Sequence, residues 1–368
     1  MKVTVKDYLN VRVGEPRLKA PTYQYLAPGS EIEIDGQLYK GDLFDGIDTW
    51  VKDLAGNYYW SGGTNYVKDK LPVQFINSKM SWGHKWYDLP FVWNDLKTTG
   101  QGVTVAVIDT GVDDNHSDLK TKLHGASKSF VDNAIDIKDT DGHGTNMAGI
   151  IGASGNNVFG VAPGVTLLVV KATKQVRGAN PKVFAEALNY AAAIPDVDII
   201  SFSNVFSDGT DLNGPVQNCI KAKKILVAAI GNGRNFIGLP QGPDSDTFPA
   251  CFPNVLAVGS FGSNGEICTF SNWNPQLSLL APGDFSVLTT GINNKTEMGA
   301  GTSIATAFTS GCLALMIAYG KGKSITGEQC IASLLGSCDD IGSSIGRDIQ
   351  SGFGRMNLRN AINKIKNL

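Results

Sequence analysis

The sequence of 368 residues lacks the signatures of several common protein classes. It has four histidines with no His-Glu-x-x-His pattern and six cysteines with no Cys-x-x-Cys pair, so a zinc site is not expected. No apolar run approaches the roughly 20 residues that span a bilayer, and no apolar signal segment opens the chain. A net charge of −2 argues against nucleic acid or an acidic membrane surface as a partner. We therefore expect a cytoplasmic protein with free, mostly buried thiols.

Glycine, by contrast, is abundant. The chain contains 43 glycines, which indicates many tight turns and close approaches of the backbone. Its 42% hydrophobic and 18% charged residues are typical of a globular protein. The length is sufficient for one large domain and a second, small one.

The first part of the chain has the pattern of short strands. Residues 3–5, 9–13, 31–35 and 48–53 are β-rich or alternate polar with apolar side chains, and no helical period interrupts them. The pair Asp35-Gly36 is typical of a hairpin turn. The pattern predicts a small all-β barrel.

The remainder of the chain alternates strand and helix patterns. We place the β-barrel domain at residues 1–68, a linker at 69–80 and the large domain at 81–368. The strands expected in the large domain are the apolar runs 103–108, 167–171, 197–202, 225–229 and 255–259. Such runs are buried on both faces of a parallel sheet, so the predicted fold is α/β, with a mostly parallel sheet and helices on both faces. In such sheets, sites lie beyond the carboxyl ends of the strands.

Four polar residues lie at the carboxyl end of an expected strand or at the amino end of an expected helix. Asp109 directly follows the strand 103–108, and Asn232 follows the strand 225–229 in the sequence Gly-Asn-Gly. His143, in Gly-His-Gly-Thr, and Ser303, in Gly-Thr-Ser, each precede an apolar run with helical character. Individually, these motifs are also compatible with a turn or a capped helix start.

Together, the four residues suit acyl transfer. Ser303 would attack an acyl carbon, His143 would take its proton and return it to the leaving group, and Asp109 would hold the imidazole in one tautomer. Asn232 and the Ser303 N–H would donate to the oxyanion. Their order along the chain, Asp then His then Ser, is that of subtilisin rather than of chymotrypsin or the α/β-hydrolases.

From Trp82 to its C-terminus, the chain resembles the subtilisin-like serine peptidases, or subtilases. Beyond the triad, the matching segments are Gly-Val-Ala-Pro at 160–163, Phe-Pro-Ala at 248–250, Ala-Pro-Gly at 281–283 and Gly-Phe-Gly-Arg at 352–355. The resemblance implies a serine endopeptidase acting on proteins or peptides. The alternatives are a catalytically weak pseudoprotease, which binds peptides without turnover, and a peptide- or cell-wall-binding protein directed by the N-terminal domain.

The resemblance also implies where the substrate binds. It assigns two walls of the S1 pocket, Ser201, Phe202 and Ser203 on one side and Ala229, Ile230 and Gly231 on the other. Ser203 stands where the family has glycine, and Ile230 where it commonly has alanine, so we expect a narrowed or reshaped pocket. Asp244 and Asp246, near the expected pocket floor, either favour basic P1 side chains or are solvated loop acids.

Many subtilases bind calcium through an aspartate a few residues after the catalytic one and through an Asn-rich loop. Asp118 and the pair Asn156-Asn157 match these two features, but the loop is short. We therefore expect no cofactor, with calcium as the alternative.

The N-terminal domain resembles the bacterial SH3-like family, through Leu-Asn-Val-Arg at 9–12, Trp-Val-Lys-Asp at 50–53 and Tyr-Tyr-Trp-Ser-Gly-Gly at 58–63. Members of that family often bind peptides or cell-wall material, so such a ligand is the partner that the resemblance implies. The aromatic side chains at 58–60 either line a groove or fill the core. We expect this domain, which replaces the family's usual propeptide, to target or regulate the protease.

Overall fold

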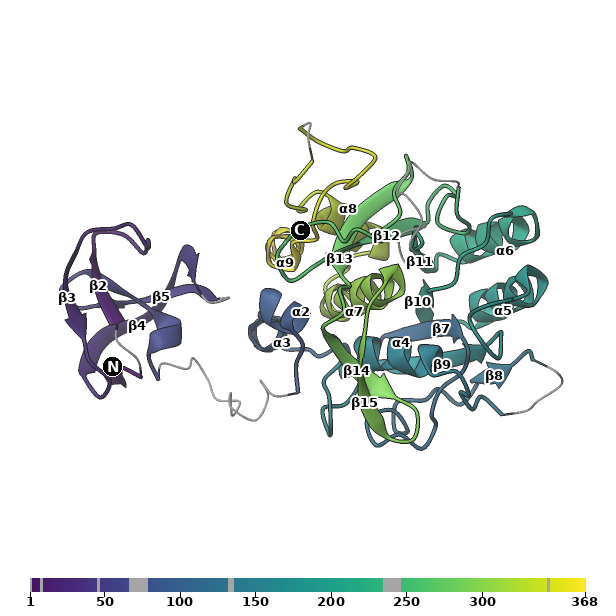
Figure 1. Ribbon diagram of the computed structural model, residues 1–368, viewed down its shortest axis with the longest axis horizontal. Coiled ribbons are helices and arrows are strands. Elements are labelled where there is room, and N and C mark those ends of the chain that lie inside the picture. Colours follow the sequence, from purple (N-terminus) through teal and green to yellow (C-terminus); the bar gives the residue numbers. More distant parts are fainter. Residues whose placement is uncertain are drawn as a thin grey trace. The chain divides into compact units, whose positions relative to one another are not determined.

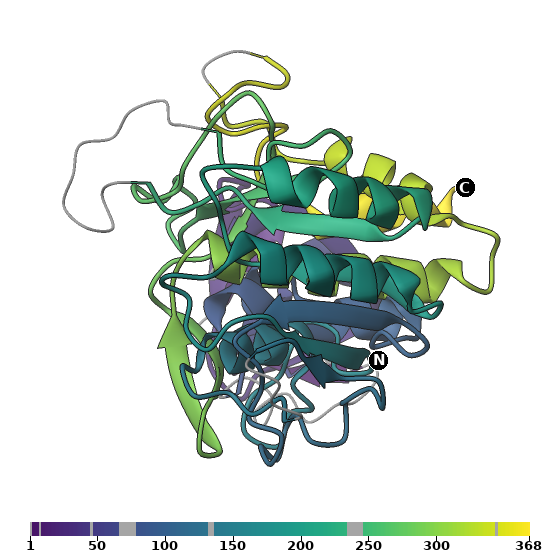
Figure 2. The same cartoon turned by 90° about the vertical axis from the view of Figure 1, so that its right-hand side faces the viewer.

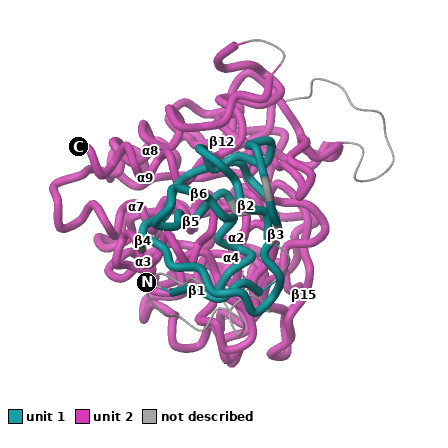
Figure 3. Tube along the Cα trace, turned by 90° about the vertical axis from the view of Figure 1, so that its left-hand side faces the viewer, with its two compact units in different colours: residues 1–74 teal, residues 75–368 magenta. Residues whose placement is uncertain are grey.

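The computed structural model describes residues 2–6, 9–44, 47–65, 79–131, 136–233, 246–342 and 345–368. The chain divides into two compact units, residues 1–74 and 75–368 (Figure 3). The linker expected at 69–80 lies outside the described residues up to position 78.

The first unit is an antiparallel all-β structure in which the strands pair in the order β1-β4-β5-β6-β2-β3. Its elements are β1 (Lys2–Thr4), β2 (Leu9–Val13), β3 (Thr22–Leu26), β4 (Glu31–Phe44), β5 (Ile47–Asp53), β6 (Asn57–Trp60) and the 3₁₀ helix η1 (Ser61–Gly63). Tyr59 belongs to the core and is 4% exposed, whereas Trp60 is only partly buried and packs edge-on against Phe44.

The hairpin expected at Asp35-Gly36 is wrong, because β4 runs through this position. The register of β4 against β5 shifts between Ile34 and Leu38, which marks a bulge. The Asp35 carboxylate accepts hydrogen bonds from the Gln37 N–H (2.9 Å) and the Tyr39 hydroxyl (2.5 Å). These bonds hold the extra residues within one strand.

The second unit is mixed α/β. Its elements are α2 (Trp82–Trp86), α3 (Leu89–Leu96), β7 (Thr104–Asp109), β8 (Lys128–Ser129), α4 (His143–Gly152), β9 (Thr166–Lys171), α5 (Pro181–Ala193), β10 (Val197–Phe202), α6 (Thr210–Lys221), β11 (Ile225–Ala229), β12 (Leu256–Phe261), β13 (Leu277–Pro282), β14 (Val287–Gly291), β15 (Lys295–Gly299), α7 (Thr302–Gly320), α8 (Gly327–Leu335) and α9 (Leu358–Lys366). The strands β7, β9, β10, β11 and β12 confirm the five strands predicted from the sequence to within two residues at each end.

A parallel sheet in the order β13-β12-β11-β10-β7-β9-β8 forms the centre of this unit. Helices α5 and α6 cover one face, and α4 and α7 cover the other (Figures 1 and 2). Both faces of β7 are buried along its whole length, as its nearly continuous apolar sequence predicts.

Helix α7 is the central helix of this unit. By length and composition alone, α7 is apolar enough to cross a membrane. However, 83% of its apolar stretch is buried inside the protein, as in the core helix of a globular protein. Small residues permit this packing: a Cβ at Gly311 would lie 2.6 Å from the Cβ of Val161. The six cysteines of the chain are free, which confirms the expectation of unpaired thiols.

Candidate active site

The topology brings the polar residues singled out in the sequence to one edge of the sheet. Strands β7, β10 and β11 are parallel neighbours, so their carboxyl ends meet there. Asp109 is the last residue of β7, Ser203 directly follows β10, and Asn232 lies three residues beyond β11. Helix α4 begins at His143, and α7 begins one residue before Ser303.

His143 and Asp109 form a short hydrogen bond. The distance from His143 Nδ1 to Asp109 Oδ1 is 2.7 Å, and the same oxygen accepts the Thr110 N–H at 2.8 Å. With the proton on Nδ1, Nε2 carries the lone pair that a general base needs. Burial by itself lowers the pKa of His143, but the charge and hydrogen bond of Asp109, helped by Asp141, raise it above the ordinary value. Asp109 is 1% exposed, whereas the His143 side chain is 20% exposed and so accessible from solvent.

Asp139 fixes the start of the helix that carries His143, a role that the sequence analysis missed. Its carboxylate accepts the backbone N–H groups of Asp141 (3.0 Å), Gly142 (2.9 Å) and Thr145 (2.9 Å), and the Thr145 hydroxyl at 2.7 Å. Burial raises the pKa of Asp139, but these hydrogen bonds lower it overall, so the carboxylate stays ionised. An acidic residue just before a helical pattern is the available sequence signal.

The amide of Asn232 is held in one orientation by Thr302. Asn232 Oδ1 accepts the Thr302 N–H at 2.8 Å and the Thr302 hydroxyl at 3.1 Å. The Thr302 hydroxyl in turn accepts the Gly231 N–H at 3.2 Å. Because the oxygen of the amide is engaged, its Nδ2 group is the part that can donate to a ligand. A Cβ at Gly301, where φ is +136°, would lie 3.1 Å from this nitrogen, so glycine keeps the space around it open.

Ser303 lies in the first turn of α7, where the backbone N–H groups have no partners within the helix. Its hydroxyl donates to the Ser203 carbonyl at 3.4 Å, and the Ser203 hydroxyl donates to the Ser303 carbonyl at the same distance. Bonds this long are weak, so the Ser303 hydroxyl is easily redirected. Catalytic hydrogen bonds commonly tighten only when substrate is bound.

The residues assigned to the S1 walls differ in what their side chains do. Phe202 is fully buried against Phe184 and Phe206, and Ile230 is fully buried in the core beneath α5 and α6. Ser201 and Ala229 are each 1% exposed, and Ser203 is 6% exposed. Gly231 adopts a φ of +100°.

The two acids near the expected pocket floor are Asp244 and Asp246. Asp244 lies outside the described residues. Asp246 is exposed, and the Cys251 thiol makes a long contact of 3.8 Å with its carboxylate. Closer to Gly231, the Thr247 hydroxyl donates to the Ile230 carbonyl at 2.8 Å.

The residues matched to a calcium site do not fit a metal ion. The Asp118 carboxylate is fully buried, and both of its oxygens accept hydrogen bonds from the loop at 154–158, mostly from backbone N–H groups. A calcium ligand must instead direct oxygen lone pairs at the ion. Among the described residues, no group of three or more His, Cys, Asp or Glu is arranged to hold a metal.

Comparison with known proteins agrees with this geometry. A model of the subtilase family matches residues 100–354. The chain is 37% identical over 228 residues to the "Major intracellular serine protease" of Bacillus subtilis (strain 168), with 60% of this chain and 70% of that protein covered. It is 32% identical over 293 residues to the "Intracellular serine protease" of Paenibacillus polymyxa, with 74% and 86% covered.

A solved structure shares the fold. It is described as the crystal structure of MycP1 with the N-terminal propeptide removed, and it superimposes with a TM-score of 0.66 at 27% sequence identity. The match covers 77% of this chain and 96% of that one.

Proposed function

The chain belongs to the subtilase family and is a serine endopeptidase, and we propose that it hydrolyses peptide bonds through an acyl-enzyme on Ser303. The observation that carries this proposal is the 2.7 Å hydrogen bond between His143 Nδ1 and Asp109 Oδ1 at the carboxyl edge of the sheet. It gives the imidazole the tautomer that a serine nucleophile requires. Proteins or peptides are the substrates.

A residue of the site carries out each step of the proposed reaction. The Ser303 hydroxyl attacks the scissile carbonyl carbon while its proton passes to His143 Nε2. Asp109 stabilises the resulting imidazolium. The Asn232 Nδ2 group and the Ser303 N–H donate to the oxyanion, and His143 then gives its proton to the leaving amine. Water, deprotonated by His143, hydrolyses the acyl-enzyme by the same route.

A fluorophosphonate probe tests this proposal directly. We expect the probe to label the folded protein covalently and to lose its target in the Ser303→Ala and His143→Ala variants. Ser310→Ala is a matched control, because Ser310 lies on the same helix but is fully buried. If Ser303→Ala is still labelled, or if the folded protein is not labelled at all, the acyl-enzyme is wrong and peptide binding without turnover is favoured.

We further propose that the N-terminal unit is an SH3-like domain that directs the protease to cell-wall material. The antiparallel strand order and the pairing of half-exposed Phe44 with Trp60 support such a role, because aromatic faces stack on sugar rings and peptide groups. Purified peptidoglycan should sediment the full-length Ser303→Ala protein. Adding Phe44→Ser should reduce that binding, whereas adding Val13→Ser, at an exposed valine of the same unit, should not.

If the ligand of the N-terminal unit is a peptide and not cell-wall material, which lies outside the cell, we propose instead that the protease acts inside the cell. Two of its relatives are named as intracellular serine proteases, although another is named a minor extracellular protease. Fractionation of the native host, with immunodetection of the full-length chain, tests this location. Recovery in the culture medium alone would contradict it.

A further inference from the structure

The loop at 154–158 is held around the buried Asp118 carboxylate. Oδ1 accepts the Ser154 hydroxyl at 3.1 Å and the Asn156 N–H at 2.5 Å, while Oδ2 accepts the N–H groups of Asn157 (2.9 Å) and Val158 (3.3 Å). With its amides turned inward, the loop satisfies a charge that would otherwise be costly to bury.

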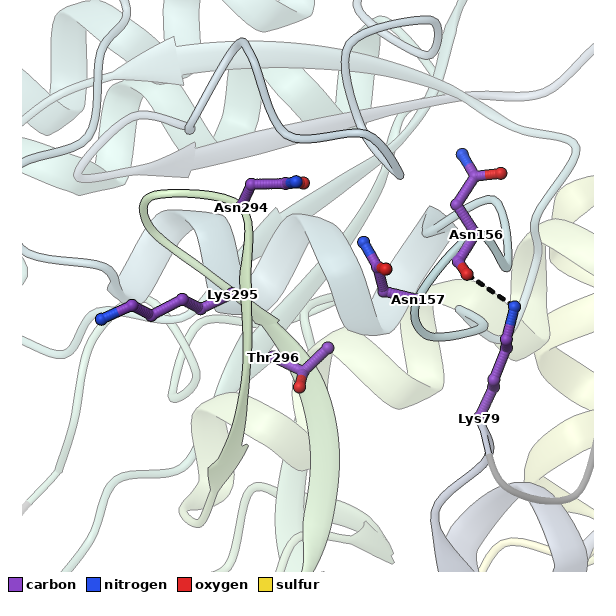
Figure 4. Close-up of a pocket in the computed structure, with 6 residues that line it drawn as sticks. All are labelled: Lys79, Asn156, Asn157, Asn294, Lys295 and Thr296. Carbon is purple, nitrogen blue, oxygen red and sulfur yellow. Dashed lines mark hydrogen bonds between the residues drawn. The ribbon is translucent and has the colours of Figure 1, made fainter.

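The carbonyl oxygens of the same loop bind a lysine. Lys79 Nζ donates to the Gly155 carbonyl at 3.0 Å and to the Asn156 carbonyl at 2.5 Å, a contact that Figure 4 shows. The Lys79 backbone is held as well, since its carbonyl accepts the Phe159 N–H at 3.0 Å. The loop therefore lies between a carboxylate that takes its amides and an ammonium that takes its carbonyls.

In this arrangement an ammonium group binds the loop carbonyls, as a bound metal ion does in other proteins. A cation stabilises a tight loop by collecting carbonyl oxygens that would otherwise face one another without a donor. Here Lys79 supplies that positive charge, and both Asp118 oxygens already have donors. A calcium ion would have to displace the lysine and reverse the peptide groups that point at Asp118.

We propose that Lys79 takes the place of a calcium ion in closing the loop at 154–158, so that the catalytic unit is stable without calcium. The loop directly follows α4, the helix that starts with His143. The Gly160 N–H donates to the Ala153 carbonyl at 2.9 Å, so the loop returns to the end of that helix. By holding this loop, Lys79 therefore stabilises the C-terminal end of the helix that carries the catalytic base.

The surroundings of Lys79 offer a matched control. Lys79, Asn156 and Asn157 line a cavity of about 540 Å³ together with Asn294, Lys295 and Thr296 (Figure 4). Lys295 comes from the hairpin β14–β15 and is exposed. Replacing it changes the charge of the same cavity without touching the loop carbonyls.

The test uses the full-length chain with Ser303→Ala, which prevents self-digestion. Its thermal midpoint should be unchanged by EDTA or by millimolar CaCl₂. Adding Lys79→Met should lower the midpoint by about 3–6 °C, the range for losing one or two charge-assisted hydrogen bonds from a unit of this size. Lys79→Arg should retain most of the stability, and Lys295→Met should change it by less than about 1–2 °C.

Hydrogen exchange locates the effect. In Lys79→Met, the amides of Asn156, Asn157 and Val158 should exchange faster, whereas Lys295→Met should leave them protected. Two results would overturn the proposal: a lower midpoint in EDTA for the protein with Lys79 intact, or Lys79→Met behaving like Lys295→Met in both measurements. The calcium measurement needs no substitution at Lys79, so it remains decisive if Lys79→Met does not fold.

Discussion

Replacing Asp109 by asparagine tests the central hydrogen bond of the site. The substitution keeps the size of the side chain but removes a charge that is 1% exposed and lies 2.7 Å from His143 Nδ1. If the amide oxygen keeps its bond to the Thr110 N–H, the imidazole loses only the charge beside it. If the amide nitrogen turns toward His143, Nδ1 must accept and the proton moves to Nε2, the wrong tautomer for a base. We expect kcat to fall about 10⁴-fold, which is about 5.4 kcal/mol of transition-state stabilisation.

The same substitution has a predictable effect on pH dependence. In the unsubstituted protein, the raised pKa of His143 places the acid limb of activity above the ordinary value of 6.5, because only the neutral imidazole acts as a base. Removing the Asp109 charge leaves burial less opposed, so the pKa of His143 should fall.

The contribution of His143 to stability depends on pH in the opposite direction to its activity as a base. A pKa raised in the folded state means that the protonated form is favoured by folding. The contribution of His143 to stability is therefore present in full below pH 6.5 and is lost as the pH rises through the raised value. The active form of the site is the less stabilised one.

NMR titration of the imidazole signals measures this shift. The Ser303→Ala protein is compared with the Ser303→Ala/Asp109→Asn protein, and His143→Gln identifies the signal. Asp141→Asn is the matched control, because Asp141 also raises the pKa of His143 but makes no bond to its ring; it should give a smaller downward shift. An unchanged or higher pKa of His143 in the Asp109→Asn protein would refute the reasoning.

Three further substitutions test the groups that surround this pair. Asn232→Ala should lower kcat about 10²–10³-fold with little change in KM, the size measured for an oxyanion-hole donor in subtilisin, a member of the same family; an equal loss through KM would contradict the role. Asp139→Ala removes the carboxylate that accepts the N–H groups of Gly142 and Thr145 at the start of α4. It should lower the free energy of unfolding in urea by about 1–2 kcal/mol and also lower kcat, because His143 begins that helix. Gly149→Ala should lower the free energy of unfolding by about 1–3 kcal/mol, because the new Cβ would lie 2.1 Å from Thr290 Oγ1. Adding Thr290→Ala to this variant should restore part of the lost stability.

The sheet and the edge that carries the site were predictable from the sequence. A strand buried on both faces is mostly apolar, as residues 105–108 are, and the polar residue that ends such a strand stands out. Asp109 could be singled out for this reason, and Asn232 by its place just past β11. The helices that start at His143 and at Thr302 could be placed because glycine and small residues precede apolar runs.

The local details depend on contacts that leave no pattern in the sequence. Ile230 follows a strand that lines the site, yet its side chain packs in the core beneath α5 and α6, because alternate residues of a strand point to opposite faces. Lys79 binds backbone carbonyls, which every sequence contains, so its partner is visible only in the fold. The bulge in β4 is of the same kind, since the bonds that Asp35 makes to Gln37 and Tyr39 compete with the turn that Asp-Gly favours.

Thr302 links the proposed oxyanion donors to the proposed nucleophile. Thr302 orients the amide of Asn232, which lies 70 positions earlier in the chain, and it immediately precedes Ser303 on α7. The two proposed oxyanion donors, the Asn232 Nδ2 group and the Ser303 N–H, therefore depend on where the first turn of α7 lies. A displacement of that turn moves the nucleophile and misorients Asn232 at once, so the groups should lose function together rather than one by one. The fully buried body of α7 opposes such a displacement, and this is the physical reason for placing a nucleophile at the start of the most deeply packed helix.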